Sequence, residues 1–170
     1  MEAYFDNSAT TIVTDSVKDI VVKTMTEDFG NPSAMHMVGV KAEKYIKEAQ
    51  ENIAKILKVD PKEIFFTSGG TESNNMAIIG TAMANKRKGN RIITTSVEHS
   101  SVLATMKYLE EQGFEVIYLP VDRYGVVQME ALEKEMTEDT ILVSTMYVNN
   151  EVGAIEPVGE IGQYLSLIHI

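Results

Sequence analysis

Apolar residues along this chain occur in two kinds of pattern, and each kind predicts a different element of secondary structure. In the first kind they recur every three or four residues, which places them on one face of a helix. Helices are expected on this basis at about 15–25, 35–57, 72–86, 100–112, 129–136 and 157–165. In the second kind they are contiguous or alternate over a short run, which is typical of strands. Strands are expected at 64–66, 92–97, 114–119 and 140–146.

The expected strands alternate with helices, and few polar residues interrupt them. Strands that are apolar on both faces are typical of a mostly parallel sheet with helices packed on either side. The sequence therefore predicts an α/β fold, a three-layer α/β/α arrangement around a mostly parallel sheet. No internal repeat, low-complexity tract or linker divides the chain.

The stretch after the first expected strand has the features of a phosphate-binding turn. Residues 67–71 supply hydroxyl groups and two glycines, and a helix follows Glu72. Glycines allow the backbone to approach an anion, and the N–H groups and dipole of a helix start attract it. The stretch lacks both the G-K-[ST] of a Walker loop and the G-x-G-x-x-G of a dinucleotide site. A plain helix start with Ser68 or Thr71 as its N-cap is the alternative.

Polar residues also follow two other expected strands. Glu98 and His99 come after the second strand, and Asn149 and Asn150 come after the fourth. Since ligands of open α/β sheets bind beyond the carboxyl ends of the strands, these groups and the 67–71 turn are expected on one rim. Together they offer an anion cradle, a flat ring and an amide donor, the set that a phosphorylated aromatic cofactor requires. Taken singly, the histidine could be a helix cap and the asparagines part of a turn.

The composition argues against several classes of function. The chain of 170 residues has a formal net charge of −10 and no basic patch, so nucleic acid is not an expected partner. It has no cysteine, which excludes disulfides and thiolate metal sites, and its three histidines are far apart, so no metal site is expected. No apolar run approaches the ~20 residues of a membrane helix. The N-terminus does not resemble a signal peptide, so a cytoplasmic location is expected.

Five segments of the chain together resemble the NifS/IscS-type cysteine desulfurases, which are class V aminotransferase-like, fold-type I pyridoxal-phosphate enzymes. Their order and spacing match that family from residue 4 to about residue 162, and they look more like the NifS/IscS branch than the SufS branch. The segments are D-N-S-A-T-T (6–11), G-N-P-S (30–33) with His36, F-T-S-G-G-T-E-S-N-N (66–75), E-H-x-x-V-L (98–103) and V-N-N-E-V-G (148–153).

The resemblance implies a role for each matching residue. Gly70 and Thr71 would hold the phosphate of pyridoxal 5′-phosphate, and His99 would stack on its ring and assist proton transfer. Asn150, chosen over its neighbour by motif alignment alone, would hydrogen-bond the ring oxygen, and Asn7 would lie near the substrate entrance. The implied reaction takes sulfur from L-cysteine, leaves L-alanine, and passes a persulfide to an iron–sulfur scaffold or another acceptor protein. The implied assembly is a homodimer with the active site near the subunit interface.

The resemblance also predicts features that this chain lacks. The family continues with H-V-D-A-x-Q, whose Asp pairs with the pyridine nitrogen, then with S-x-H-K, whose lysine forms the Schiff base, and then with a loop that carries the nucleophilic cysteine. None of these is present, and S-L-I-H-I at 166–170 does not fit the continuation. We therefore expect an N-terminal arm at 1–13 near the active site and an incomplete large domain at 14–170. We expect these residues alone to catalyse no desulfuration and to be poorly soluble.

Two alternatives stay open at this point. One is another class V enzyme, such as a selenocysteine lyase or an aminotransferase, which the cysteine loop would distinguish. The other is a non-catalytic phosphate- or nucleotide-binding α/β module, in which the polar arm at 6–11 would have no evident use.

Overall fold

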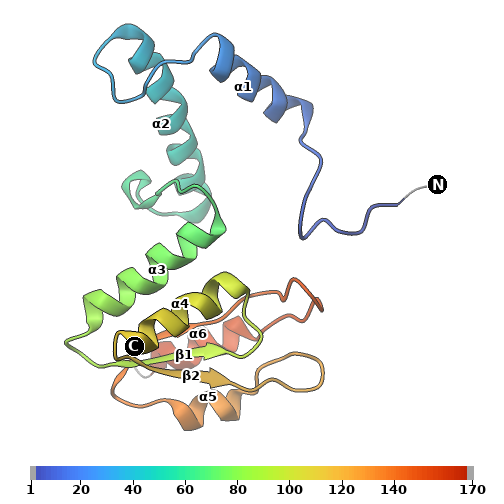
Figure 1. Ribbon diagram of the computed structural model, residues 1–170, viewed down its shortest axis with the longest axis vertical. Helices are drawn as coiled ribbons and strands as arrows, with labels where there is room; N and C mark the ends of the chain where they lie inside the picture. The colour runs from blue at the N-terminus through green and yellow to red at the C-terminus, as the bar shows by residue number, and fades with distance from the viewer. Residues whose placement is uncertain (1–2, 168–170) are drawn as a thin grey trace. The chain divides into compact units, whose positions relative to one another are not determined.

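The computed structural model describes residues 3–167, and these belong to two compact units. The first unit ends at Phe66 and is helical, with α1 (Asp15–Thr26), α2 (Met37–Leu57) and a short 3-10 helix, η1 (Pro61–Glu63). The second unit begins at Thr67 and contains the sheet and its helices (Figure 1). The predicted boundary between an arm at 1–13 and a domain at 14–170 stays a prediction.

The second unit alternates helices with strands, as the apolar pattern predicted. Its elements are α3 (Gly70–Asn85), β1 (Arg91–Thr95), α4 (Ser100–Glu111), β2 (Glu115–Leu119), α5 (Met129–Glu135), β3 (Thr140–Ser144) and α6 (Val158–Leu167). β1 pairs in parallel with β2 on one side and with β3 on the other, so the strand order is β2-β1-β3. The predicted α/β fold with a parallel sheet is therefore confirmed.

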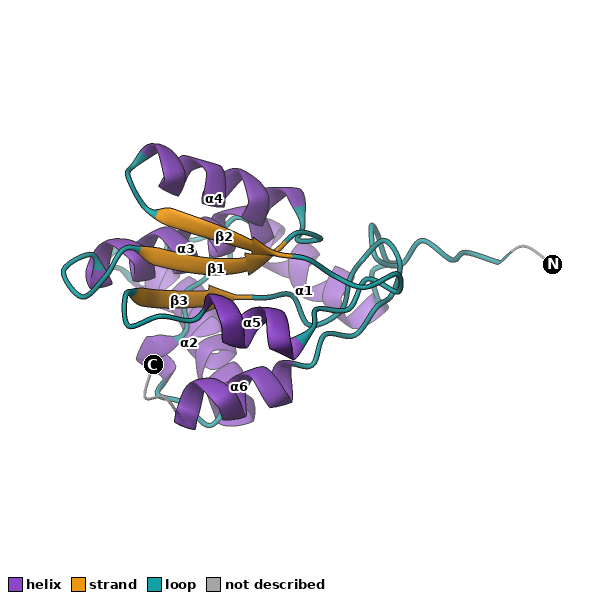
Figure 2. Ribbon diagram, turned by 90° about the horizontal axis from the view of Figure 1, so that it is seen from below, coloured by secondary structure: helices purple, strands orange, loops and turns teal. Residues whose placement is uncertain are grey.

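Helices cover both faces of this sheet. Successive residues of a strand point to opposite faces, so neighbouring residues of β1 show what packs on each face. Ile92 packs in one core with residues of α3 and α4, and its neighbour Ile93 packs in another with residues of α5 and α6. The first core contains Ile78, Ala82, Ile92, Val102, Met106, Leu109 and Phe114. The second contains Ile93, Leu119, Val127, Leu132 and Ile161. Figure 2 views the sheet from the side of α5 and α6, with the strands running in one direction.

One predicted strand is wrong. Residues 64–66 form no strand, and the side chains of Phe65 and Phe66 are 71% and 53% exposed. A strand needs a neighbouring strand to take up its backbone hydrogen bonds, whereas the carbonyl of Ile64 accepts the side-chain N–H of Gln50 at 3.0 Å. The other predicted helices and strands are confirmed, with ends that differ by two residues or fewer.

The G-N-P-S segment closes a tight loop against the start of α2. A Cβ atom at Gly39 would collide with the carbonyl oxygens of Ala34 and Asn31, and one at Gly30 would collide with the carbonyl of Val38. His36 caps α2, since its Nδ1 accepts the N–H of Gly39 at 3.2 Å. In this unit the segment therefore has a structural use. Among the helices of residues 3–167, none is long and apolar enough to cross a membrane.

Candidate functional site

The sheet diverges where two of the predicted polar clusters follow their strands. After β1 the chain continues into α4 on one face, and after β3 it continues to α6 on the opposite face. Such a divergence leaves a crevice beyond the carboxyl ends of the two neighbouring strands, which is where open α/β sheets bind ligands. His99 follows β1 and Asn150 follows β3, so both belong to this rim.

Within residues 3–167, no side chain caps the start of α3. The N-cap residue is Gly69, and it makes no side-chain cap hydrogen bond, so the alternative with Ser68 or Thr71 as N-cap is wrong. Instead, the carboxylate of Glu72 reaches back and accepts the N–H and the hydroxyl of Ser68, each at 2.6 Å. These hydrogen bonds lower the pKa of Glu72. The N–H groups of Gly70 and Thr71 are left as donors for an anion.

His99 is the N-cap of α4. Its Nδ1 accepts the backbone N–H of Ser101 at 3.1 Å, so the helix-cap interpretation of this histidine is confirmed. The cap uses one nitrogen only, and the side chain is otherwise exposed. Because Nδ1 acts as an acceptor, the neutral ring carries its hydrogen on Nε2. The cap does not involve Nε2 of this exposed side chain.

Hydrogen bonds tie the start of α3 to this histidine. The amide nitrogen of Asn74, in the second turn of α3, donates to the hydroxyl of Ser101 at 2.9 Å, and that hydroxyl lies 2.9 Å from Nδ1 of His99. One residue along, the hydroxyl of Thr105 donates to Oδ1 of Asn75 at 2.8 Å. The 67–71 turn and His99 are thus held in one local arrangement.

The loops after β1 and β3 are joined in the same way. The buried carboxylate of Glu98 accepts the N–H of Met146 at 2.6 Å and the hydroxyl of Thr95 at 3.3 Å. Burial raises the pKa of Glu98 above its ordinary value, although the Met146 N–H opposes this. The side chain of Asn149 donates to the carbonyl of Val97 at 3.0 Å. Sequence reasoning did not find these two clamps, since their partners are distant along the chain.

The two neighbouring asparagines differ in environment. Asn149 is 5% exposed, and its Oδ1 accepts the N–H groups of Glu151 and Val152 at 2.8 and 3.0 Å, which closes the turn. Asn150 is exposed, with its amide nitrogen donating only to Glu151 at 3.2 Å among the described contacts. Its amide is therefore the one accessible to a ligand. Asn7 lies in the other unit, and its place at a substrate entrance stays a prediction.

A hollow of about 500 Å³ opens at this rim. It is lined by Val97, Glu98, Asp122, Arg123, Tyr124, Gly125, Asn149, Glu151 and Val152. The loop after β2 thus contributes to the rim. No group of three or more metal-binding side chains occurs within residues 3–167.

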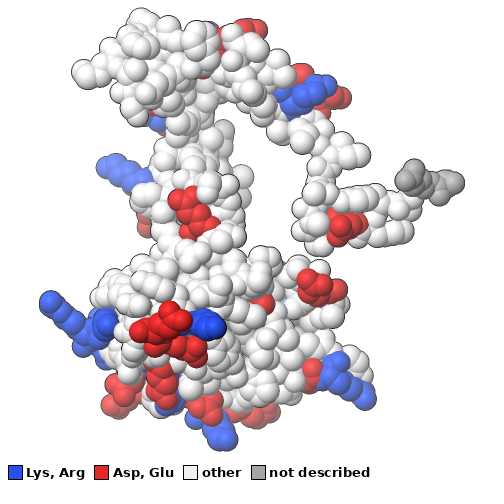
Figure 3. Space-filling view, viewed as in Figure 1, with Lys and Arg blue, Asp and Glu red and all other residues white. Residues whose placement is uncertain are grey.

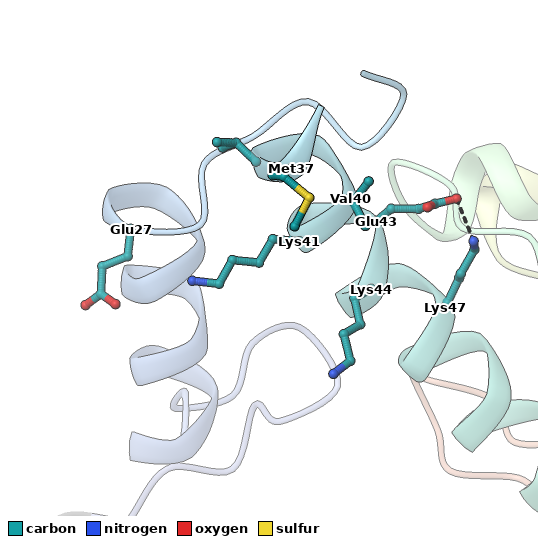
Figure 4. Close-up of a pocket in the computed structure, with 8 residues that line it drawn as sticks. Glu27, Met37, Val40, Lys41, Glu43, Lys44 and Lys47 are labelled. Atoms are coloured by element: carbon teal, nitrogen blue, oxygen red, sulfur yellow. Dashed lines mark ion pairs between the residues drawn. The ribbon is translucent and has the colours of Figure 1, made fainter. Parts of the chain in front are cut away.

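A larger hollow of about 620 Å³ lies in the helical unit (Figure 4). Neither it nor the rim hollow is lined by the predicted residues Gly70, Thr71, His99 and Asn150. Its lining is Glu27, Met37, Val38, Val40, Lys41, Glu43, Lys44 and Lys47. Each of its lysines has a carboxylate partner: Lys41 pairs with the buried Asp28, Lys44 with Glu48 at 3.5 Å and Lys47 with Glu43 at 2.8 Å. Lys41 and the Tyr45 hydroxyl together lower the pKa of Asp28.

Comparison with known proteins settles the family. The aminotransferase class-V family matches residues 3–169. This chain belongs to that family. Curated relatives of this class V chain include cysteine desulfurase IscS 1 of Archaeoglobus fulgidus, 47% identical over 163 residues, and cysteine desulfurase IscS of Methanosarcina thermophila, 51% identical over 160 residues. The matches cover 96% and 94% of this chain but 43% and 40% of the relatives, so the chain spans about two fifths of their length.

Solved structures agree with this class V assignment. A NifS-like protein superposes with a TM-score of 0.93 at 47% identity, over 98% of this chain and 46% of that protein. A structure described as SspA in complex with cysteine superposes with a TM-score of 0.90 at 38% identity, over 98% of this chain and 48% of that one. The predicted resemblance to NifS/IscS proteins and the predicted fold class, part of a fold-type I enzyme, are confirmed.

The rim of this class V chain fits the cofactor that its family implies, pyridoxal 5′-phosphate. A phosphate needs unpaired N–H donors, which the uncapped start of α3 supplies. A pyridine ring needs a flat partner, and the exposed imidazole of His99, held through Nδ1, is one. A ring oxygen needs a donor, which the exposed amide of Asn150 offers.

Proposed function

We propose that this chain is part of a pyridoxal-phosphate-dependent cysteine desulfurase, which converts L-cysteine to L-alanine and delivers persulfide sulfur for iron–sulfur cluster or thio-cofactor assembly. The observation that carries the proposal is the hydrogen-bonded joining of the α3 start, the His99 loop and the Asn149–Asn150 turn on one rim. The names of the relatives support the reaction, because several at 47–51% identity are cysteine desulfurases.

Each rim residue takes a role that its geometry supports. The N–H groups of Gly70 and Thr71 and the hydroxyl of Thr71 bind the phosphate dianion at the positive end of α3. The ring of His99 stacks on the pyridine, and its Nε2 holds or passes a proton. The amide of Asn150 donates to the ring oxygen. Bound pyridoxal phosphate supplies an electron sink for bonds broken at the substrate α-carbon.

The residues of this chain do not by themselves complete the reaction. The chain contains no cysteine, and a thiolate is the group that accepts sulfur as a persulfide. We propose that these 170 residues bind the cofactor reversibly and release no sulfide from cysteine. The whole protein would act as a cytoplasmic homodimer with a sulfur-acceptor protein as partner. The SspA structure, which holds cysteine, supports L-cysteine as the substrate.

A second candidate is another class V reaction, such as selenocysteine lysis or transamination. The family match favours it to the extent that the family as a whole is described as aminotransferases. Activity of the longer protein on L-cysteine, L-selenocysteine and an amino-acid and keto-acid pair separates the two candidates.

Cofactor binding is testable on the 170-residue chain with pyridoxine 5′-phosphate, which lacks the aldehyde and so cannot react with lysines. We expect saturable binding in equilibrium dialysis and weaker binding of pyridoxine without phosphate. Thr71→Val should weaken binding about tenfold, because it removes a hydrogen bond to a charged group. Thr81→Val, in the same helix, is the matched control. Equal binding of the two pyridoxines would contradict the proposed phosphate site.

A further inference from the structure

Three side chains form a continuous hydrogen-bonded chain between α3 and α4. The amide nitrogen of Asn74 is 2.9 Å from the hydroxyl of Ser101, and that hydroxyl is 2.9 Å from Nδ1 of His99. Ser101 is 8% exposed, and Asn74 is half-buried, so little solvent competes for these bonds. None of the segments that carry the family resemblance accounts for Ser101.

The direction of the hydrogens follows from which groups can donate. An amide nitrogen can only donate, so Asn74 gives its hydrogen to the oxygen of Ser101. The hydroxyl hydrogen of Ser101 is then free to point at Nδ1 of His99. Nδ1 must be an acceptor, because it already receives the backbone N–H of Ser101 at 3.1 Å. Both donors therefore favour the ring tautomer with its hydrogen on Nε2.

A second hydrogen bond of the same kind holds Ser101 in place without touching the histidine. The hydroxyl of Thr105 lies 2.8 Å from both the carbonyl of Ser101 and Oδ1 of Asn75. This contact also joins α3 to α4, and the Thr105 side chain is buried. Thr105 thus provides a control in which helix packing changes while the groups that contact Nδ1 do not.

We propose that Asn74 and Ser101 are positioning residues that hold His99 in the Nε2–H tautomer with a fixed ring plane. The use of this arrangement rests on the proposed function. A ring that is already oriented can stack on a pyridine without reorganising, and its N–H hydrogen is kept on Nε2. In this proposal Ser101 acts on Nδ1 of His99, and Asn74 acts through Ser101.

The tautomer can be read directly by long-range ¹H–¹⁵N correlation of ¹⁵N-histidine in the 170-residue chain, without cofactor and at alkaline pH, where imidazoles are neutral. We expect the unmodified chain to show His99 with its hydrogen on Nε2. In Ser101→Ala the ratio of the two tautomers should fall about fivefold, which corresponds to the roughly 1 kcal/mol of one hydrogen bond.

Asn74→Asp tests the direction of the chain without removing the hydroxyl. A carboxylate can only accept, so the Ser101 hydroxyl would turn to it and leave Nδ1 with the backbone N–H alone. We expect the tautomer ratio to fall as in Ser101→Ala. Ser101→Thr, which keeps a hydroxyl, should show the tautomer ratio of the unmodified chain, and so should Thr105→Val. Backbone amide spectra of each variant check that the fold is retained.

An unchanged tautomer ratio in both Ser101→Ala and Asn74→Asp would overturn the positioning role. An equal change in Thr105→Val would also overturn it, because the ring would then respond to helix packing rather than to the hydroxyl. Binding of pyridoxine 5′-phosphate is measured separately. If the substitutions do not change the tautomer ratio but the unmodified chain binds pyridoxine 5′-phosphate, the positioning role alone is refuted. If the substitutions change the ratio but the unmodified chain does not bind, the proposed function alone is refuted.

Discussion

Asn149 and Asn150 have the same side chain and different tasks. Asn149 uses its amide and its oxygen to hold the turn after β3 to the loop after β1. Asn150 projects from that turn and is exposed. Of the two, only Asn150 can give its amide to a ligand without undoing the fold.

We expect Asn149→Ala to lower the free energy of unfolding by about 2–4 kcal/mol, because it leaves buried backbone groups without partners. Asn150→Ala should change it by no more than about 0.5 kcal/mol, as is usual at exposed positions. Urea denaturation measures both. For Asn150→Ala, we expect the loss of free energy of pyridoxine 5′-phosphate binding to exceed the change in the free energy of unfolding. Equal destabilisation by the two substitutions would contradict this division.

Glu98 makes stability depend on pH. Burial raises its folded-state pKa above the ordinary 4.5, so the folded chain holds this proton more tightly than the unfolded chain does. Its contribution is therefore complete below that value and is lost as the pH rises through the higher folded-state pKa.

Glu98→Gln removes the titration and keeps an oxygen for the Met146 N–H. We expect the stability of Glu98→Gln relative to the unmodified chain to increase as the pH is raised from about 4 to about 8. Thermal unfolding across this range measures the difference. Glu111→Gln, at the exposed end of α4, is the control and should follow the unmodified chain. Parallel profiles for Glu98→Gln and the unmodified chain would show that Glu98 titrates normally.

At the scale of the element, α4 depends on His99 for its start. The imidazole takes the place that Ser, Thr, Asp or Asn usually fills at a helix N-terminus. A loss of binding in a variant without the ring could therefore come from an unravelled first turn. To separate the two effects, His99 must be replaced by a residue that caps the helix as well as histidine does but has no ring.

Asparagine is such a residue, because it is among the best N-caps and has no ring. We expect His99→Ala to lower the free energy of unfolding by about 1 kcal/mol and His99→Asn to leave it nearly unchanged. Both should lose binding of pyridoxine 5′-phosphate to a similar extent, as dialysis would measure. Full binding by His99→Asn would mean that the cap, not the ring, is what the site needs.

The start of α3 illustrates the same dependence on element ends. Glu72 accepts both donors of Ser68, and the cap position is a glycine, so no side chain competes for the first N–H groups. The sequence identified the turn as a phosphate site or a capped helix. The structure rules out the cap by Ser68 or Thr71, and the phosphate site stays a prediction.

At the scale of the whole molecule, the helical unit presents much apolar surface. α1 buries none of its side chains, and Val17, Ile20, Val21 and Met25 are 53%, 50%, 47% and 73% exposed. In Figure 3 much of the visible face of this unit carries no acidic or basic side chain, whereas the two signs of charge are interspersed over the sheet unit. Apolar patches of this kind favour self-association.

We expect the 170-residue chain to self-associate in sedimentation experiments despite its net charge of −10. Ile20→Gln with Met25→Gln should reduce the association while changing the free energy of unfolding by less than about 0.5 kcal/mol, because both side chains are exposed. Ser16→Gln, on the same helix, is the control and should not reduce it. A monodisperse monomer of the unmodified chain would contradict this prediction.

The positions of the helices and the three strands of the sheet follow from local periodicity, which neighbouring residues along the chain carry. The same periodicity failed at 64–66, because a strand is formed by two segments, and the apolar run describes only one of them. The loop motifs also pointed to His99 and Asn150 as rim residues, since both lie in loops that follow strands.

Other features depend on residues far apart in the sequence. The contacts of Asn149 with Val97, of Glu98 with Met146 and of Asn74 with Ser101 join residues 52, 48 and 27 positions apart. These contacts make Asn149 a clamp, join buried Glu98 to the loop after β3 and orient the hydroxyl beside His99. A local pattern contains no information about which distant group will be adjacent, because packing of the helices on the sheet makes that choice. Most element positions were therefore readable from the chain, whereas the partners of Asn149, Glu98 and Asn74 required the folded structure.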